Sequence, residues 1–271
     1  MTAQAEELRI AGLVPFSTVD WPGKIAASLF LQGCPWRCPY CHNAEILDVR
    51  APGTVPWQQV SDLMGKRAGL LDGVVFSGGE ALLQASSNGS GPLEAAMAEV
   101  KELGFKVGLH TGGAYPKRLA NLLNRGLVDW VGLDIKALPG TYQLATGSPA
   151  AATRAESALG VLADFDAARG PDSAHKDRDF SWEVRLTLWP GLLGEGRVTA
   201  PEMIDYAEQV AKWSRELGAR NFALQRYRKP REQTSGSQEP SVTPLSEGPH
   251  WEADQAARVL EGIGFSQVSI R

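Results

Sequence analysis

Short apolar runs alternate with amphipathic stretches along most of the chain. The apolar, β-branched runs predict strands over Ile25–Leu31, Gly73–Phe76, Phe105–Leu109, Trp130–Asp134, Glu183–Leu188, Asn221–Leu224 and Ser266–Ile270. Apolar residues at helical spacing predict helices over Trp57–Arg67, Leu93–Leu103, Pro116–Arg125, Ala151–Ala168, Ala200–Leu217 and Trp251–Ile263. Strands that alternate with helices indicate βα units and a parallel sheet. About six consecutive units favour an open or closed barrel, with the active site in the loops after the strands.

The remaining segments divide into loops and one extension. Ser86–Pro92 is rich in Gly and Ser, Arg169–Arg178 is charged, and Thr234–Pro249 has no periodicity, so we expect surface loops there and a flexible one over 234–249. Residues 1–24 are expected to be an N-terminal extension. Because βα units continue on both sides of each loop, a single domain over 1–271 is expected.

Composition narrows the functional classes. Hydrophobic residues make up 43% and charged residues 21% of the 271 positions, which is typical of a soluble globular protein. The net charge of −4 gives no reason to expect binding to nucleic acid or to an anionic membrane. We find no signal peptide at the start and no apolar run of membrane-spanning length, so a cytoplasmic protein is expected.

All three cysteines of the chain lie in one loop. Cys34, Cys38 and Cys41 fall within Gln32–Asn43 (QGCPWRCPYCHN), directly after a predicted strand. An odd number of clustered cysteines does not fit a disulfide framework. Three thiolates can instead hold three corners of a 4Fe-4S cluster. With no fourth cysteine in the chain, the fourth iron is left open to a small molecule that chelates through amine and carboxylate groups.

Two other interpretations of the loop are weaker. A Cys₃His zinc site would need His42, but His42 is adjacent to Cys41, and neighbouring residues rarely both reach one tetrahedral ion. A redox pair would use only Cys38 and Cys41 and would leave Cys34 unexplained.

The CxxxCxxC spacing with Tyr40 before the last cysteine resembles the radical S-adenosylmethionine (SAM) superfamily. This resemblance implies an α/β fold, a partial (β/α)₆ TIM-like barrel in a single domain. It also implies a SAM-chelated 4Fe-4S cluster and reductive cleavage to a 5′-deoxyadenosyl radical. Cys34, Cys38 and Cys41 would then be the metal ligands, with Tyr40 and His42 among the cofactor-binding residues.

A second motif follows the next strand. In Phe76–Glu80 (FSGGE), the glycines allow backbone to approach a ligand closely, and Glu80 can accept from an ammonium group. A Gly-Gly pair alone usually marks a turn. After the cysteine loop, it resembles the superfamily's GGE motif, which assigns SAM binding to Ser77, Gly78, Gly79 and Glu80.

Charged residues end two later strands. Asp134 and Lys136, two residues apart in Leu133–Lys136 (LDIK), share one face of a strand, although a solvent-exposed ion pair is an alternative. The resemblance places both beside SAM, with Lys136 paired to its carboxylate, and Thr111 of Leu109–Gly113 (LHTGG) also matches. His110 replaces an aspartate of some relatives, so a monovalent-cation site there is in question.

Arg185 in Glu183–Gly191 (EVRLTLWPG) is predicted to point inward, because its neighbours in the strand are apolar. A guanidinium inside a barrel needs an anion. The SAM carboxylate and an acid on a neighbouring strand are equally good candidates.

The stretch Ile10–Asn43, with its STVDWPG run, resembles glycyl radical enzyme activating proteins. Together with VDWVGLDIKA, Tyr142 and Thr146–Gly147, it is most similar to the activating proteins of anaerobic ribonucleoside-triphosphate reductase. This resemblance implies an oxidoreductase that generates a glycyl radical on its partner enzyme, anaerobic ribonucleoside-triphosphate reductase. It also implies an electron donor, such as flavodoxin or ferredoxin, that reduces the cluster. Asp20 would line the opening for the partner's glycine loop, or else cap the turn at Trp21–Gly23.

Two other functions remain open. One is a radical SAM enzyme that acts on a small molecule or nucleoside, for example one similar to a deazapurine synthase. The other is a non-catalytic iron–sulfur or zinc protein, which would account for the cysteines but not for FSGGE and LDIK.

Overall fold

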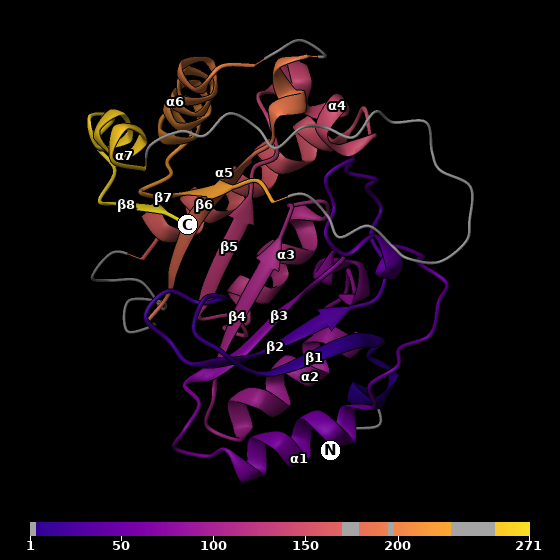
Figure 1. The fold of residues 1–271 in the computed structure, drawn as a ribbon. Coiled ribbons are helices and arrows are strands. Elements are labelled where there is room, and N and C mark those ends of the chain that lie inside the picture. The colour runs from indigo at the N-terminus through magenta and orange to yellow at the C-terminus, as the bar shows by residue number, and fades with distance from the viewer. Residues whose placement is uncertain (1–3, 170–178, 195–197, 229–252) are drawn as a thin grey trace.

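One eight-stranded sheet organises the molecule, and its strands lie in the order of the sequence, from β1 to β8 (Figure 1). The computed structural model describes residues 4–169, 179–194, 198–228 and 253–271. The strands are β1 Ile10–Ser17, β2 Ala26–Leu31, β3 Gly73–Gly78, β4 Lys106–Thr111, β5 Trp130–Asp134, β6 Ser181–Leu188, β7 Asn221–Arg226 and β8 Gln267–Ile270. From β2 to β8 every pairing is parallel, which confirms the predicted βα units.

Helices cover the outer side of this curved sheet (Figure 1). They are α1 Trp57–Lys66, α2 Pro92–Glu102, α3 Pro116–Asn124, α4 Tyr142–Thr146, α5 Ala151–Ala167, α6 Ala200–Glu216 and α7 Ala253–Glu261. Every predicted helix is present, whereas the short α4 was not predicted. The result is a single α/β domain whose sheet is open between β1 and β8, which confirms the predicted fold class.

The segment expected to be an N-terminal extension contains β1, which pairs antiparallel with β2. The pattern of β1 does not alternate cleanly between buried and exposed positions, because irregularities in register flank Gly12 and Ser17. Pro15 lacks the N–H group that a central strand needs, and is tolerated at an edge. A period-two pattern was therefore absent from the sequence, although the strand is present.

The two faces of the sheet differ in chemistry. Apolar side chains such as Leu29, Phe76, Leu109 and Leu133 are fully buried in the large core. The other face carries polar side chains toward the carboxyl ends of the strands, where the site is formed. At the amino ends, a separate apolar cluster of Trp21, Ala26, Val75 and Trp130 fills the interior, and the two indole rings stack at 5.7 Å.

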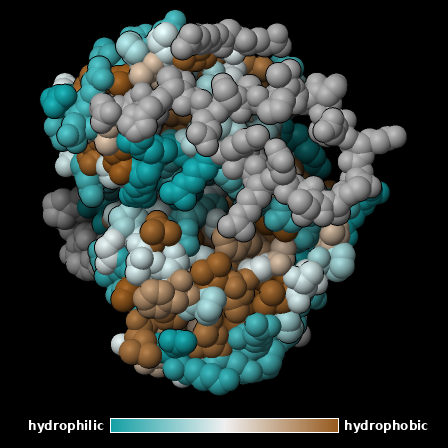
Figure 2. Space-filling view, in the orientation of Figure 1, coloured by the Kyte–Doolittle hydropathy of each residue, from teal (hydrophilic) through white to brown (hydrophobic). Residues whose placement is uncertain are grey.

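Exposed apolar side chains gather on β1 and the residues after it. Val14 is 38% exposed, Phe16 54% and Val19 75%. Figure 2 shows apolar residues below the centre of the molecule, over the region where Figure 1 draws β1. This edge of the sheet therefore presents an apolar surface beside the open side of the barrel.

Two further expectations were tested only in part. Within the described ranges, no helix combines the length and the apolar character that crossing a membrane requires. The predicted loop over 234–249, and all of the charged loop except Arg169, lie outside the described residues.

Candidate active site

The cysteine loop leaves the carboxyl end of β2 at Gly33, whose backbone conformation only glycine adopts easily. Gly33 has φ +98°, a left-handed conformation that side chains disfavour. Its N–H donates to Ile46 O at 2.8 Å, and the Cys34 N–H donates to Leu47 O at 3.2 Å. The backbone N–H of Arg37 donates to Thr146 O at 2.9 Å. These bonds hold the loop against the residues that follow it and against the end of α4.

The three thiols are free, and the surroundings of Cys34 and Cys38 favour the neutral form of the thiol. Cys34 is buried, and Cys38 and Cys41 are half-buried. Burial, followed by the nearby Glu80 carboxylate, raises the pKa of Cys34 to about 12. Burial also raises the pKa of Cys38. The positive charge of bound iron would stabilise the thiolates of Cys34 and Cys38, because metal binding requires deprotonated cysteine.

The donor set fits a cluster. Within the described residues, no three His, Cys, Asp or Glu side chains are grouped around a single ion. The cysteines of a cluster bind different irons, so such a grouping is not required. The backbone beside the loop is shaped for close approach: a Cβ on Gly79 would lie 2.3 Å from Gly33 O and 3.2 Å from Cys34 Cβ. The Tyr40 hydroxyl is buried and has no hydrogen-bond partner among the described residues.

The FSGGE motif packs directly on the start of the cysteine loop. Gly79 N–H donates to Leu31 O at 3.0 Å, and Glu80 N–H donates to Gly33 O at 2.9 Å. Gly78 has φ +113°, and a Cβ there would lie 2.1 Å from Leu31 N. The glycines are therefore needed for backbone packing, whether or not they also contact a ligand.

The buried Glu80 carboxylate accepts hydrogen bonds from neighbouring residues of the protein. It accepts from Thr111 Oγ1 at 2.7 Å, from Leu82 N at 3.1 Å and from Gly112 N at 3.0 Å. Burial raises its pKa, and these bonds partly offset the shift. Glu80 thus ties the end of β3 to the end of β4. Its contact with a SAM ammonium group stays a prediction.

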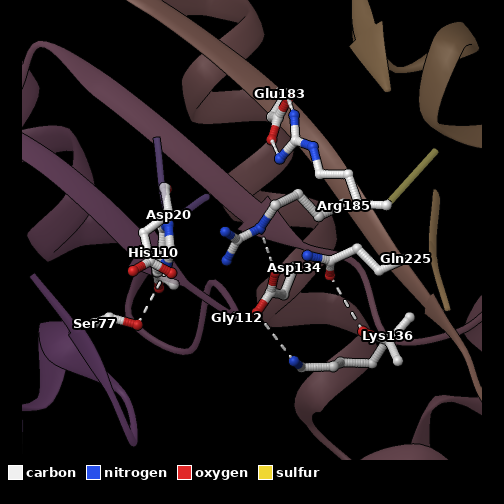
Figure 3. Close-up of polar contacts among 12 residues, drawn as sticks. Asp20, Ser77, His110, Gly112, Asp134, Lys136, Glu183, Arg185 and Gln225 are labelled. Atoms are coloured by element: carbon white, nitrogen blue, oxygen red, sulfur yellow. Dashed lines mark hydrogen bonds and ion pairs between the residues drawn. The ribbon is translucent and has the colours of Figure 1, made fainter. Parts of the chain in front are cut away.

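Asp134 and Arg185 meet across neighbouring parallel strands, with Lys136 beside them (Figure 3). Arg185 Nε donates to Asp134 Oδ1 at 2.7 Å, and Lys136 Nζ donates to Asp134 Oδ2 at 3.2 Å. The three side chains are largely buried, so this is not the solvent-exposed pair considered for Asp134 and Lys136. For Arg185, the acid on a neighbouring strand is the anion found.

This group has more positive than negative charge. One carboxylate serves two cations, and among the described residues neither Arg185 nor Lys136 has a second carboxylate within ion-pair distance. Burial opposes the ionised form of Asp134, but the two cations hold its pKa well below the usual range. Burial likewise opposes the charge of Lys136, and Asp134 keeps its pKa well above the usual range. The surplus of buried positive charge suits an anionic ligand group.

His110 is a neutral hydrogen-bonding residue. Its Nε2 lies 2.7 Å from Asp20 O, and Ser77 Oγ lies 3.1 Å from its Nδ1 (Figure 3). Since a carbonyl only accepts, Nε2 carries the proton and Ser77 donates to Nδ1. Burial, with Arg185, lowers the pKa of His110 to about 3. A neutral imidazole therefore stands where some relatives are expected to carry an aspartate.

Asp20 faces the interior. Its carboxylate accepts from Ser28 Oγ at 2.6 Å. Burial raises its pKa, but hydrogen bonds from Ser17 and Ser28, together with the interactions with His110 and Arg185, outweigh that effect and lower it. The following turn is closed by its own backbone, through Lys24 N–H and Trp21 O at 3.1 Å. Among the described residues, no bond links the Asp20 side chain to that turn, so the structure gives no support to the capping role.

Tyr40 and His42 occupy different surroundings. The Tyr40 ring is buried and stacks on Trp189 at 5.1 Å. His42 is more exposed, and burial followed by the charge of Arg228 lowers its pKa. Thr111 lies with Glu80, as described above. Cofactor contacts of all three stay predictions.

Sequence reasoning did not assign roles to several residues that shape the site. Trp36 packs on the end of β4, where a Cβ on Gly112 would lie 2.3 Å from its ring. The Tyr142 hydroxyl accepts from Lys136 N at 3.1 Å, and Thr187 Oγ1 donates to Gln225 Oε1 at 3.2 Å. An aromatic residue inside the cysteine motif was the available signal for Trp36. Thr187 and Gln225 meet only through the pairing of β6 with β7, and Tyr142, named above for the resemblance alone, reaches Lys136 from α4.

Comparison with known proteins agrees with this site. Residues 28–162 match the model of the radical SAM superfamily. A Methanocaldococcus jannaschii protein that carries the name glycyl-radical enzyme activating enzyme is 35% identical over 127 residues, which is 47% of this chain and 50% of that protein. The pyruvate formate-lyase-activating enzyme of Staphylococcus aureus is 32% identical over 151 residues, which is 49% of this chain and 55% of the relative.

A solved structure shares the fold. Streptococcus suis SuiB superposes with a TM-score of 0.54 at 9% identity, over 90% of this chain and 47% of that one. The chain spans about half the length of the curated relatives it matches.

Fold, cysteine loop and family match together define a radical SAM domain. The chain belongs to the radical SAM superfamily. This family uses a 4Fe-4S cluster and SAM. The three free thiols and the positively charged strand ends fit those two groups.

Proposed function

We propose that the chain is a radical SAM activase that generates a glycyl radical on a partner enzyme. The observation that carries this proposal is that both curated relatives described above have names of activating enzymes, and that they match over about half of this chain. The proposed partner is anaerobic ribonucleoside-triphosphate reductase, on the basis of the STVDWPG and LDIKA stretches.

Cys34, Cys38 and Cys41 would hold the cluster, leaving one iron for SAM. When bound, the cluster supplies one electron that cleaves the SAM sulfonium to methionine and a 5′-deoxyadenosyl radical, which removes hydrogen from the partner's glycine. Arg185 and Lys136 would orient the SAM carboxylate, because Asp134 neutralises only one of these two cations. Gly78 and Gly79 would allow the backbone to approach the ligand.

Other residues protect and position the site. The Trp21 and Trp130 rings fill the amino end of the barrel and exclude water from that side. Exclusion of water limits side reactions of a reactive intermediate. His110 stays neutral and holds the backbone of Asp20 in the interior, beside the open edge of the sheet. Asp20 would line the path by which a glycine loop enters.

A second partner is favoured by one specific observation. The S. aureus relative is named for activation of pyruvate formate-lyase. Pyruvate formate-lyase is therefore the alternative partner, and the two candidates are tested side by side.

The decisive experiment is anaerobic reconstitution with iron and sulfide, followed by reduction and incubation with SAM and each glycyl radical enzyme. A glycyl doublet in the electron paramagnetic resonance spectrum is expected with the true partner, and the Cys34→Ala variant should give none. Deoxyadenosine formation with no doublet from either partner would contradict the activase proposal and favour a small-molecule substrate. A cluster signal that is indifferent to SAM would contradict radical SAM chemistry altogether.

A further inference from the structure

The segment that follows β5 runs from Lys136 back to the cysteine loop. It contains a 3₁₀ turn over Pro139–Thr141 and then the helix α4. Tyr142, the first residue of α4, is fully buried, and so is Thr146, the last. We call residues 136–147 the connecting segment, because one end carries Lys136 and the other end is hydrogen-bonded to the cysteine loop.

The Tyr142 side chain contacts both parts of the site. Its hydroxyl accepts from the backbone N–H of Lys136 at 3.1 Å. Its ring lies edge to face with the indole of Trp36, with 6.3 Å between the ring centres and 75° between the ring planes. Trp36 lies between Cys34 and Cys38 in the cysteine loop. One buried side chain therefore connects the backbone of Lys136 to that loop.

The carboxyl end of α4 gives a second link to the cysteine loop. The Thr146 carbonyl accepts from the Arg37 N–H at 2.9 Å, and the Thr146 hydroxyl donates to Tyr142 O at 2.8 Å. Gly147 ends the helix with φ +68°, and its N–H donates to Gln143 O at 2.8 Å. A left-handed residue after the last turn is a common helix end. The helix thus ends with the Thr146 carbonyl bonded to the cysteine loop instead of to a further turn.

A second tyrosine holds the middle of the connecting segment from α6. The buried Tyr206 hydroxyl accepts from Leu138 N at 3.0 Å and lies 2.7 Å from Thr141 Oγ1. The Thr141 hydroxyl donates to Leu138 O at 3.3 Å, so the Tyr206 hydroxyl is the donor in its bond to Thr141. Tyr142 and Tyr206 therefore hold the connecting segment at two points.

The position of Lys136 matters because two separate groups would bind one carboxylate. The open iron of the cluster would chelate the amine and carboxylate of SAM, and Lys136 would pair with the same carboxylate. Lys136 follows β5, where it lies beside Asp134 (Figure 3), whereas the cysteine loop follows β2. In the sheet β3 and β4 separate these two strands. The connecting segment is a direct link between the two groups, in addition to the sheet.

We propose that Tyr142 is a positioning residue that fixes Lys136 relative to the cysteine loop, with Tyr206 holding the same segment from α6. The inference rests on the proposed function, because it takes Lys136 as the partner of the SAM carboxylate. A site that is held in place before binding takes its ligand more tightly, since less conformational freedom is lost. Both tyrosines act through Lys136 and not by contact with SAM.

The test is calorimetric titration of the reconstituted enzyme with SAM, with iron and sulfide content measured on the same samples. Tyr142→Phe removes the acceptor for Lys136 N but keeps the ring against Trp36. We expect normal iron content and a dissociation constant for SAM about five- to tenfold higher, the effect of one lost hydrogen bond. Tyr206→Phe should change the dissociation constant in the same direction by a smaller factor, because it acts on the middle of the segment.

Ser214→Ala is the matched control. Ser214 is also on α6 and is fully buried, and its hydroxyl donates to Val210 O at 2.8 Å. The variant loses a buried hydroxyl from the same helix as Tyr206→Phe, but one whose bond stays within the helix. It should bind SAM like wild type, and urea unfolding shows how far each variant loosens the fold.

A double variant separates positioning from general loosening. If Tyr142 acts through Lys136, Tyr142→Phe should have little further effect on SAM binding once Lys136→Met has removed the cation. A merely structural role would raise the dissociation constant by the same factor with and without Lys136. The change that SAM causes in the electron paramagnetic resonance spectrum of the reduced cluster gives a second measure of the bound fraction.

An unchanged dissociation constant in folded, iron-loaded Tyr142→Phe would overturn the proposal. Equal factors with and without Lys136 would do the same, as would a loss of SAM affinity in Ser214→Ala as large as that in Tyr206→Phe. Normal SAM binding by Lys136→Met would also overturn it, because Lys136 would then have no contact to position. These titrations include no glycyl radical enzyme, so the activase proposal stands or fails separately, on the glycyl doublet.

Discussion

At the scale of single residues, the charges at the strand ends decide what the site can bind. Arg185 uses Nε for Asp134, and its guanidinium lies against Gly132, where a Cβ would be 2.8 Å from Cζ. The other N–H groups of the Arg185 guanidinium have no hydrogen-bond partner among the described residues. A planar fork with free donors is suited to a carboxylate.

Replacement of Arg185 by Gln should weaken SAM binding. A hydrogen bond to a charged group contributes roughly 1.5–3 kcal/mol, so the dissociation constant should rise by about 10- to 100-fold. Calorimetric titration of the reconstituted protein measures this, and Arg220→Gln, which removes an exposed arginine, is the control. An unchanged dissociation constant in a folded variant would leave Arg185 only as the partner of Asp134.

His110 makes the stability of the protein depend on pH. The pKa of His110 is about 3 in the folded protein and about 6.5 in the unfolded chain. Below pH 6.5 the unfolded chain therefore binds one more proton, and stability falls as the pH falls through the window from 6.5 to 3. Between pH 7.5 and 5.5 the free energy of unfolding should drop by about 1.4 kcal/mol from this residue.

The His110→Gln variant tests this assignment. Its amide can donate to Asp20 O and accept from Ser77, but it does not titrate. Urea unfolding at the two pH values should show a smaller loss in the variant than in wild type. Identical losses in both proteins would place the acid sensitivity elsewhere.

Residue types and spacing predicted much of this site, but not its pairings. The two-residue interval predicted that Asp134 and Lys136 share a face, and the cysteine spacing predicted the loop. Which acid meets Arg185 depends on the register of β5 against β6, which joins residues 51 positions apart. The neutral state of His110 depends on burial and on Arg185, neither of which is visible in the residues next to it.

At the scale of elements, glycines set how closely the β2 and β3 ends approach. Gly79→Ala would place a methyl group 2.3 Å from the Gly33 carbonyl, which is backbone and cannot move aside cheaply. The start of the cysteine loop must then shift. We expect the variant to retain substantially less iron after reconstitution than wild type, as measured by iron and sulfide content.

Gly65→Ala is the matched control, because a Cβ there meets nothing within 4 Å. It lies inside α1, where Ala is favoured over Gly by roughly 0.5–1 kcal/mol. The control should bind iron normally and unfold at slightly higher urea. Normal iron content in Gly79→Ala would show that the loop tolerates the displacement.

Elements with clear periodicity were predictable, and those set by contacts were not. Strands such as β2 and β3 have dense apolar runs because parallel strands are buried on the helix-covered face. β1 has Pro15 and irregular register, so its pairing comes from β2 rather than from its own pattern. The five-residue α4 is too short for a helical period to appear, and its Thr146 and Tyr142 hold it against the cysteine loop and Lys136.

At the scale of the whole molecule, the last strand is tied to the interior by an ion pair across 88 positions. Arg271 donates through both terminal nitrogens to the Glu183 carboxylate, at 2.8 and 2.9 Å. The Glu183 side chain is only 8% exposed, whereas Arg271 is 27% exposed. Removal of the arginine would therefore leave a buried carboxylate without its partner, at the open edge of the barrel.

Arg271→Ala should accordingly lower the free energy of unfolding by about 3 kcal/mol, the cost of breaking a largely buried pair from one side. Arg220→Ala, which removes a 62% exposed partner 3.7 Å from Asp166, should change it by less than about 1 kcal/mol. Urea unfolding of both variants measures the difference. Adding Glu183→Gln to Arg271→Ala should recover part of the loss, because the uncompensated charge is gone while the gap in packing remains. If the double variant is no more stable than Arg271→Ala, the arginine stabilises β8 through packing on β7, and the charge of Glu183 is satisfied in another way.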